Sequence, residues 1–189
     1  MDSLQTLPDT CRGILFDLDG TLLKVEMKEF IPAYLNALYP FFDDIAKREH
    51  FVRVFRGAIT FLLRNGDGEK TNEEKFVQAI KNHLDIDCEA FRSRMGTFCD
   101  EALQQLSDFI QPDPRAREVL QVCFDMGLKV AIATNPVFPL SVVRARLEWG
   151  MIGDFPFHWI ASLENTRYCK PHEGFFFEIL AALQLYSAD

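Results

Sequence analysis

The clearest pattern of hydrophobic and polar positions lies near the N-terminus, where a short apolar run ends in two acids, Asp17 and Asp19. The run has no helical period, which predicts a buried strand over about Arg12–Asp17. In extended geometry the two acids would point to the same side, because only Leu18 separates them. Gly20 permits a tight turn and a loop with free backbone N–H groups. We therefore expect two carboxylates at the carboxyl end of a strand, where ligands bind in open α/β sheets.

Helical periodicity replaces this pattern in the next part of the chain. Apolar residues spaced three or four positions apart predict four helices. They cover about residues 28–38, 45–64, 72–84 and 90–109. Prolines, glycines and aspartates separate them, and Thr71 followed by acids is a typical helix start. The sequence therefore predicts a helical insert with no strand signal.

Strands and helices alternate in the remainder of the chain. We expect helices over about 115–126, 140–149 and 174–186, and strands over about 128–133 and 158–161. Right-handed crossovers between such strands produce a parallel sheet. The predicted fold is therefore an α/β core formed by residues 1–24 and 111–189, with residues 25–110 inserted as a helical unit.

Composition narrows the classes of function. A formal net charge of −8 argues against nucleic acid and against anionic membrane surfaces as partners. No apolar run approaches the roughly 20 residues that span a bilayer. Five cysteines without a Cys-x-x-Cys pair, and a polar N-terminus without a signal pattern, favour a reducing compartment. We expect a cytoplasmic protein, and its oligomeric state stays open.

Further polar residues follow the later strands. Thr134 and Asn135 end the second strand, and Lys170 precedes the last helix. Taken singly, Thr-Asn-Pro is typical of a turn that starts a helix with the asparagine as cap, and a lone lysine is usually a solvated charge. A calcium loop starting at Asp17 is disfavoured, because its twelfth position would be Lys28 instead of a glutamate. Together, two carboxylates, a hydroxyl and a lysine at one sheet edge suit phosphoryl chemistry.

These motifs resemble those of the haloacid dehalogenase (HAD) superfamily. An apolar strand followed by Asp-x-Asp-Gly-Thr is similar to the family's first motif, and Thr134-Asn135 is similar to the second. Lys170-Pro171, with Phe176 beyond it, resembles the third. The helical insert resembles the C1 cap of the phosphatase-like branch. The resemblance implies a Rossmannoid parallel sheet with an inserted helical cap.

The resemblance also implies a reaction. Asp17 would be the nucleophile that attacks phosphorus and forms an aspartyl-phosphate. Asp19 would protonate the leaving oxygen and later take a proton from water. Mg²⁺ would bridge the Asp17 carboxylate, the backbone carbonyl of Asp19 and a phosphate oxygen. This chemistry implies a phosphatase that acts on a small phosphorylated metabolite.

The remaining candidate residues would hold the phosphate, as the resemblance implies. Lys170 would add positive charge and steady Asp17. Thr134 would donate a hydrogen bond to a transferring oxygen, as would the backbone N–H of Asn135. Gly20 and Thr21 would form the phosphate-binding turn after the first strand.

One expected part has no counterpart in the sequence. The family's fourth motif is an acidic pair beyond the lysine, and no such pair occurs before Asp189. We expect the natural chain to continue past this residue. The alternative is a HAD-like protein that binds a phosphorylated ligand or a protein partner without turnover. The acid at position 19 favours transfer to or from oxygen over dehalogenation, and a phosphomutase is a further alternative.

Overall fold

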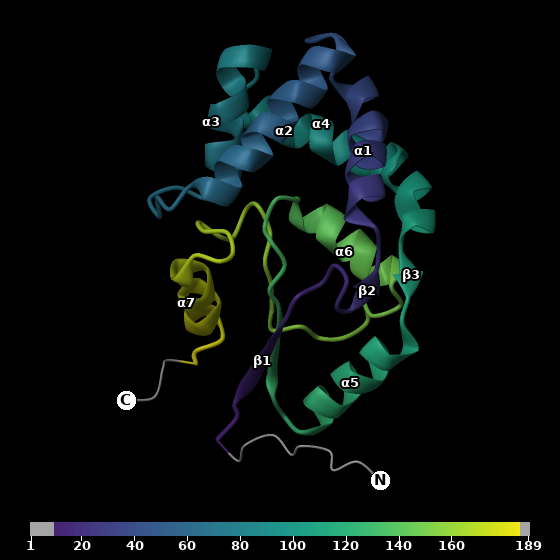
Figure 1. Cartoon of the computed structure of the whole chain (residues 1–189), viewed down its shortest axis with the longest axis vertical. Helices are drawn as coiled ribbons and strands as arrows, with labels where there is room; N and C mark the ends of the chain where they lie inside the picture. Colours follow the sequence, from purple (N-terminus) through teal and green to yellow (C-terminus); the bar gives the residue numbers. More distant parts are fainter. Residues whose placement is uncertain (1–9, 186–189) are drawn as a thin grey trace.

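A three-stranded parallel sheet lies at the centre of the computed structural model, which describes residues 10–185 (Figure 1). Its strands are β1 (Gly13–Phe16), β4 (Lys129–Ile132) and β5 (Trp159–Ile160), in the order β1-β4-β5. The register aligns Phe16 with Ile132 and Ile132 with Ile160, so the strands end together. The α/β fold class predicted from the sequence is therefore confirmed, and β1 lies at one edge of this sheet.

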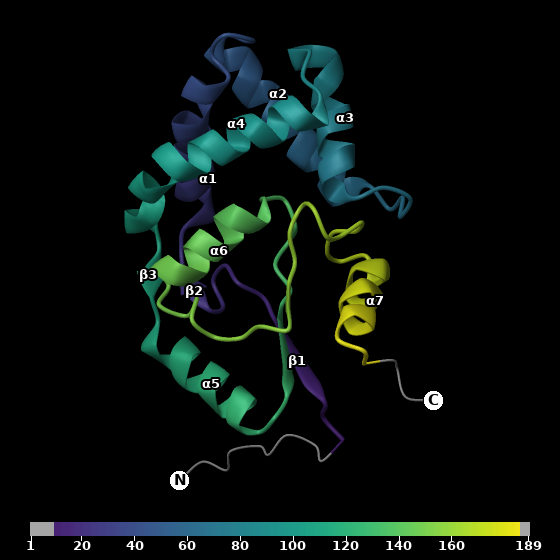
Figure 2. The ribbon, with the colours of Figure 1, turned by 180° about the vertical axis from the view of Figure 1, so that it is seen from behind.

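Helices cover both faces of the sheet (Figures 1 and 2). They are α5 (Pro114–Asp125), α6 (Leu140–Trp149) and α7 (Glu173–Ala182). Successive residues of β4 point to opposite faces. Val130 and Ile132 belong to the core shared with α5 and α6, whereas Ala131 packs against Phe175 of α7. These packed faces hold the strand ends rigidly in place.

The segment between β1 and α5 forms a separate group of helices beyond the carboxyl ends of the strands, which we call the helical layer (Figure 1). It contains α1 (Met27–Leu38), η1 (Tyr39–Phe41), α2 (Arg48–Arg64), α3 (Asn72–Leu84), α4 (Cys88–Glu101) and η2 (Leu103–Phe109). Aromatic side chains fill its interior, for example Phe42, Phe51 and Phe55. The predicted helix over 90–109 is broken at Ala102, whose φ of −132° leaves the α-helical range.

A two-stranded ribbon that the sequence did not predict joins the helical layer to the sheet. Its strands are β2 (Leu23–Lys24) and β3 (Gln111–Pro112), and they pair antiparallel. Two residues are too few to show a period of two, which explains why the pattern was missed. The ribbon lies where the insert was expected to leave and rejoin the core.

The signals at helix ends predicted the start of α3 correctly and the end of the last helix wrongly. Thr71 and Glu74 form a capping box at the start of α3, and Gly127 adopts a φ of +70° after α5. The last helix was expected to reach residue 186, but α7 ends at Ala182, and residue 186 lies outside the described range. Within residues 10–185 no helix has the length and apolarity required to cross a membrane.

Candidate active site

Asp17 and Lys170 meet at the carboxyl edge of the sheet. Asp17 follows β1 directly, and Lys170 lies in the loop between β5 and α7. Their side chains form an ion pair with 2.5 Å between Lys170 Nζ and Asp17 Oδ1. The Asp17 side chain is 40% exposed, so one face of the carboxylate is accessible from solvent. The structure thus brings together the two residues that the sequence predicted to be neighbours.

The turn after Asp17 differs from the expected phosphate cradle. Gly20 has a φ of +75°, as a tight turn requires. However, the backbone N–H groups of Thr21, Leu22 and Leu23 all donate to Leu18 O, and that of Gly20 donates to Leu23 O. The expectation of free N–H groups is therefore wrong for residues 20–23, because the turn satisfies these donors itself. The Thr21 hydroxyl does lie 3.5 Å from Asp17 Oδ2 and donates to it.

Thr134 and Asn135 follow β4 and reach the same edge. Thr134 is buried, and Asn135 Oδ1 accepts a 2.9 Å hydrogen bond from the backbone N–H of Lys170. Asn135 therefore fixes the lysine loop. The alternative reading of Asn135 as a helix cap is wrong, since α6 begins five residues later with Pro139 as its N-cap residue. The backbone N–H of Asn135 has no acceptor within residues 10–185.

Asp19 contacts a cation that the sequence reasoning did not consider. Its Oδ1 atom lies against Nη2 of Arg146, a residue of α6 whose side chain is 0% exposed. Burial lowers the pKa of Arg146 to about 10, and the charge of Asp17 opposes this shift. Because β1 ends before Asp17, strand alternation does not orient Asp19, and the two carboxylates contact different cations. Arg146 follows the buried Val142 by four residues, and this helical spacing is the sequence signal that places Arg146 on the buried face of α6.

The loop that carries the site lysine is bound to the helical layer. Asn72 Nδ2 at the start of α3 donates to Thr166 Oγ1 at 3.0 Å and to Tyr168 O at 3.2 Å. Lys75 Nζ donates to Arg167 O at 2.6 Å, and burial lowers the pKa of this lysine. Asn72 and Lys75 are 1% and 3% exposed. A buried polar junction therefore connects α3 to the edge of the sheet, across more than ninety residues of sequence.

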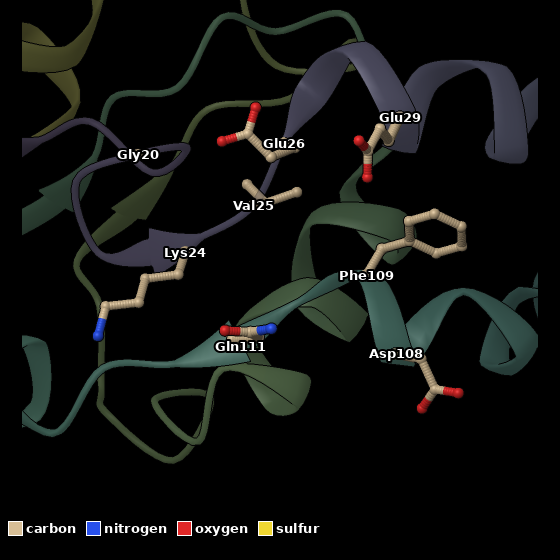
Figure 3. Close-up of a pocket in the computed structure, with 8 residues that line it drawn as sticks. All are labelled: Gly20, Lys24, Val25, Glu26, Glu29, Asp108, Phe109 and Gln111. Carbon is tan, nitrogen blue, oxygen red and sulfur yellow. The ribbon is translucent and has the colours of Figure 1, made fainter.

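A cavity of about 610 Å³ opens beside the turn, between β2, the start of α1 and the end of η2 (Figure 3). It is lined by Gly20, Lys24, Val25, Glu26, Glu29, Asp108, Phe109 and Gln111. Three carboxylates and one amine give this cavity a negative potential, which disfavours a phosphate group. Only Gly20 is shared with the predicted site. Asp17 and Lys170 do not line this cavity.

The donors for a metal ion are few but sufficient for Mg²⁺. Within residues 10–185 no group of three or more His, Cys, Asp or Glu side chains is arranged to hold a metal. Mg²⁺ commonly binds proteins through one or two carboxylates and completes its shell with phosphate and water. The Asp17 carboxylate, whose side chain is 40% exposed, matches that requirement, and the backbone carbonyl of Asp19 is the second donor that the resemblance implies. The Asp19 side chain, turned toward Arg146, is not a ligand in this arrangement.

The chain is similar to several solved structures. A structure of a HAD phosphatase from Thermococcus onnurineus matches 92% of this chain and 72% of its own, with 18% identity and a TM-score of 0.50. A predicted phosphoglycolate phosphatase from Haemophilus somnus matches 93% and 73%, with 19% identity and a TM-score of 0.48. The L-2-haloacid dehalogenase from Xanthobacter autotrophicus, with chloropropionic acid covalently bound, matches 94% and 67%, with 21% identity and a TM-score of 0.49.

At these identities the likeness concerns the fold alone, and the matched structures include both phosphatases and a dehalogenase. No curated protein matches the chain. A sequence model of one family covers residues 11–188, which is nearly the entire chain. The chain therefore belongs to the haloacid dehalogenase-like hydrolases.

Proposed function

We propose that this protein is a Mg²⁺-dependent phosphatase of small phosphorylated metabolites. The observation that carries the proposal is the ion pair of Asp17 and Lys170 at the carboxyl edge of the sheet. A carboxylate nucleophile repels a phosphate dianion, so the attacked group needs positive charge next to the nucleophile. Lys170 supplies that charge at hydrogen-bond distance.

The reaction would proceed in two displacements at phosphorus. An Asp17 oxygen forms a bond to phosphorus while the bond to the leaving oxygen breaks, and Asp19 gives its proton to that oxygen. Water then attacks the aspartyl-phosphate, Asp19 takes the water proton, and inorganic phosphate leaves. Thr134 and the backbone N–H of Asn135 would donate to the transferring oxygens. Bound Mg²⁺ would supply further charge neutralisation at the phosphate.

The helical layer would serve as a cap over the α/β core. This role agrees with the proposed division into a core and an inserted unit at residues 25–110. Closure of a cap excludes water and selects the leaving group. The junction formed by Asn72 and Lys75 places this layer directly against the lysine loop. A cytoplasmic setting is part of the proposal, since all five cysteines are free thiols.

A second candidate is a protein that binds a phosphorylated ligand without turnover. It is favoured by the shortage of metal-ligating side chains within residues 10–185. The two candidates differ in their need for Mg²⁺, because a binder uses Lys170 without a metal.

A panel of phosphate esters, incubated with and without Mg²⁺, tests the proposal. We expect phosphate release that stops with a chelator and in Asp17→Asn. Phosphate transfer between positions of a sugar phosphate would indicate a mutase, and halide release from 2-haloacids a dehalogenase. Mg²⁺-independent binding without any turnover would support the second candidate and contradict the first.

A further inference from the structure

The feature that the proposed function leaves unexplained is the buried guanidinium of Arg146. This side chain is fully buried and packs against Phe30 of α1 and Phe138 of the segment after β4, with 5.1 Å from its Cζ atom to each ring centroid. Its Nη2 atom also lies 3.9 Å from the sulfur of Met27. Arg146 therefore contacts the helical layer, the sheet edge and the Asp19 turn at once.

Burial of this charge is costly and incompletely compensated. Its Nε and Nη1 atoms have no hydrogen-bond partner within residues 10–185, and its one carboxylate contact in that range is Asp19. A buried ion with so few partners generally lowers stability in comparison with an apolar residue of similar size. Such a group therefore needs an explanation other than stability.

The Asp19 carboxylate also lacks a hydrogen-bond partner for one of its oxygens within residues 10–185. Its Oδ1 atom is buried and has no hydrogen bond within the described residues, so the contact with Arg146 is what orients it. The backbone gives little orientation at this point, because Gly20 follows immediately in a left-handed conformation. A general acid must be held close to its productive geometry to act efficiently.

We propose that Arg146 is the positioning residue for Asp19, holding its carboxylate in the orientation used for proton transfer to the leaving group. This inference rests on the proposed phosphatase function. Because the guanidinium packs against both Phe30 of α1 and Phe138, the orientation of Asp19 depends on how α1 lies against the sheet edge. Arg146 itself does not touch the phosphate and acts only through Asp19.

Leaving-group dependence tests the proposal. The p-nitrophenolate group of p-nitrophenyl phosphate leaves without a proton, whereas the glycerol oxygen of glycerol phosphate needs a proton to leave. We expect Arg146→Met to lower kcat/KM for glycerol phosphate by about 10²-fold more than kcat/KM for p-nitrophenyl phosphate, as loss of general acid catalysis would. The comparison uses kcat/KM because it reports the first displacement, whereas kcat also includes the second displacement, which both substrates share. Arg146→Lys should restore part of the loss. The exposed Arg144 on the same helix is the matched control, and Arg144→Met should change neither rate.

The same substitution is then made in the Asp19→Asn background. If Arg146 acts through Asp19, Arg146→Met causes no further selective loss there. An equal loss of kcat/KM on both substrates, or a selective loss that persists without the Asp19 carboxylate, would overturn the assignment.

Equilibrium unfolding gives a readout that is independent of activity. The Asp19→Asn and Arg146→Met variants and their double form a cycle in which we expect the two changes to be coupled by roughly tenfold in the unfolding equilibrium constant. Independent effects would contradict the contact. If the wild-type protein hydrolyses neither ester, the proposed function fails, while the unfolding cycle still decides whether Arg146 holds Asp19.

Discussion

Replacement of Asn72 by alanine should destabilise the protein, because this side chain joins α3 to the lysine loop. Two hydrogen bonds are lost, one to Thr166 Oγ1 at 3.0 Å and one to Tyr168 O at 3.2 Å. Thr166 keeps its own donation to Ser162 O, so the Tyr168 carbonyl is the acceptor left most clearly unpaired. A lost neutral hydrogen bond costs about 1 kcal/mol, and an unpaired buried acceptor costs about 1–3 kcal/mol.

The expected total is about 2–4 kcal/mol, reduced by about 0.5 kcal/mol because alanine favours helix more than asparagine does. Urea unfolding followed by tryptophan fluorescence measures this change as a lower midpoint with an unchanged slope. Asn82→Ala is the control, because Asn82 is exposed on the same helix. A free energy of unfolding for Asn72→Ala within about 0.5 kcal/mol of that of the control would refute the reasoning.

Two further predictions concern charged groups. Lys170→Met should lower kcat/KM for phosphate esters by about 10²–10³-fold, because Asp17 loses the adjacent positive charge, and a loss of less than about tenfold would contradict this role. Asp113 at the start of α5 has a pKa of about 2, lowered first by the backbone N–H of Arg115 and then by its side chain. Since this folded pKa is below the ordinary value of 3.8, the carboxylate stabilises the fold above about pH 4 and loses that effect as the pH falls through about 2. Wild type should therefore lose more stability than Asp113→Asn over that acid range, and parallel pH profiles would exclude the contribution.

The elements that the sequence predicted correctly are those with a strong local signal. The apolar run before Asp17 forms the predicted strand, although β1 lies at the sheet edge and is half-buried instead of buried. The parallel sheet follows from alternation of strands and helices. That topology places Asp17 and Lys170 at one edge, which the structure shows directly. The rule that parallel strands bring their carboxyl ends to the same sheet edge was sufficient here, because it depends on the topology and not on individual side-chain contacts.

The contacts that the sequence did not predict depend on packing between distant segments. Arg146 lies on the buried stripe of its helix, but nothing in the local pattern indicates that Asp19 lies opposite. Asn72 was interpreted as the start of a helix, and its role against the lysine loop depends on where the helical layer rests. The expectation of free N–H groups at residues 20–23 was wrong for a related reason, since turn geometry decides which donors stay available.

The central claim is that Asp17 becomes phosphorylated during turnover. The most direct measurement is a rapid acid quench of the protein during hydrolysis of p-nitrophenyl phosphate with Mg²⁺, followed by peptide mass mapping. The account predicts one added phosphoryl group on the peptide that contains Asp17, and none in Asp17→Asn. Phosphate release without this adduct in a quench fast enough to trap turnover, or an adduct on another residue, would contradict it.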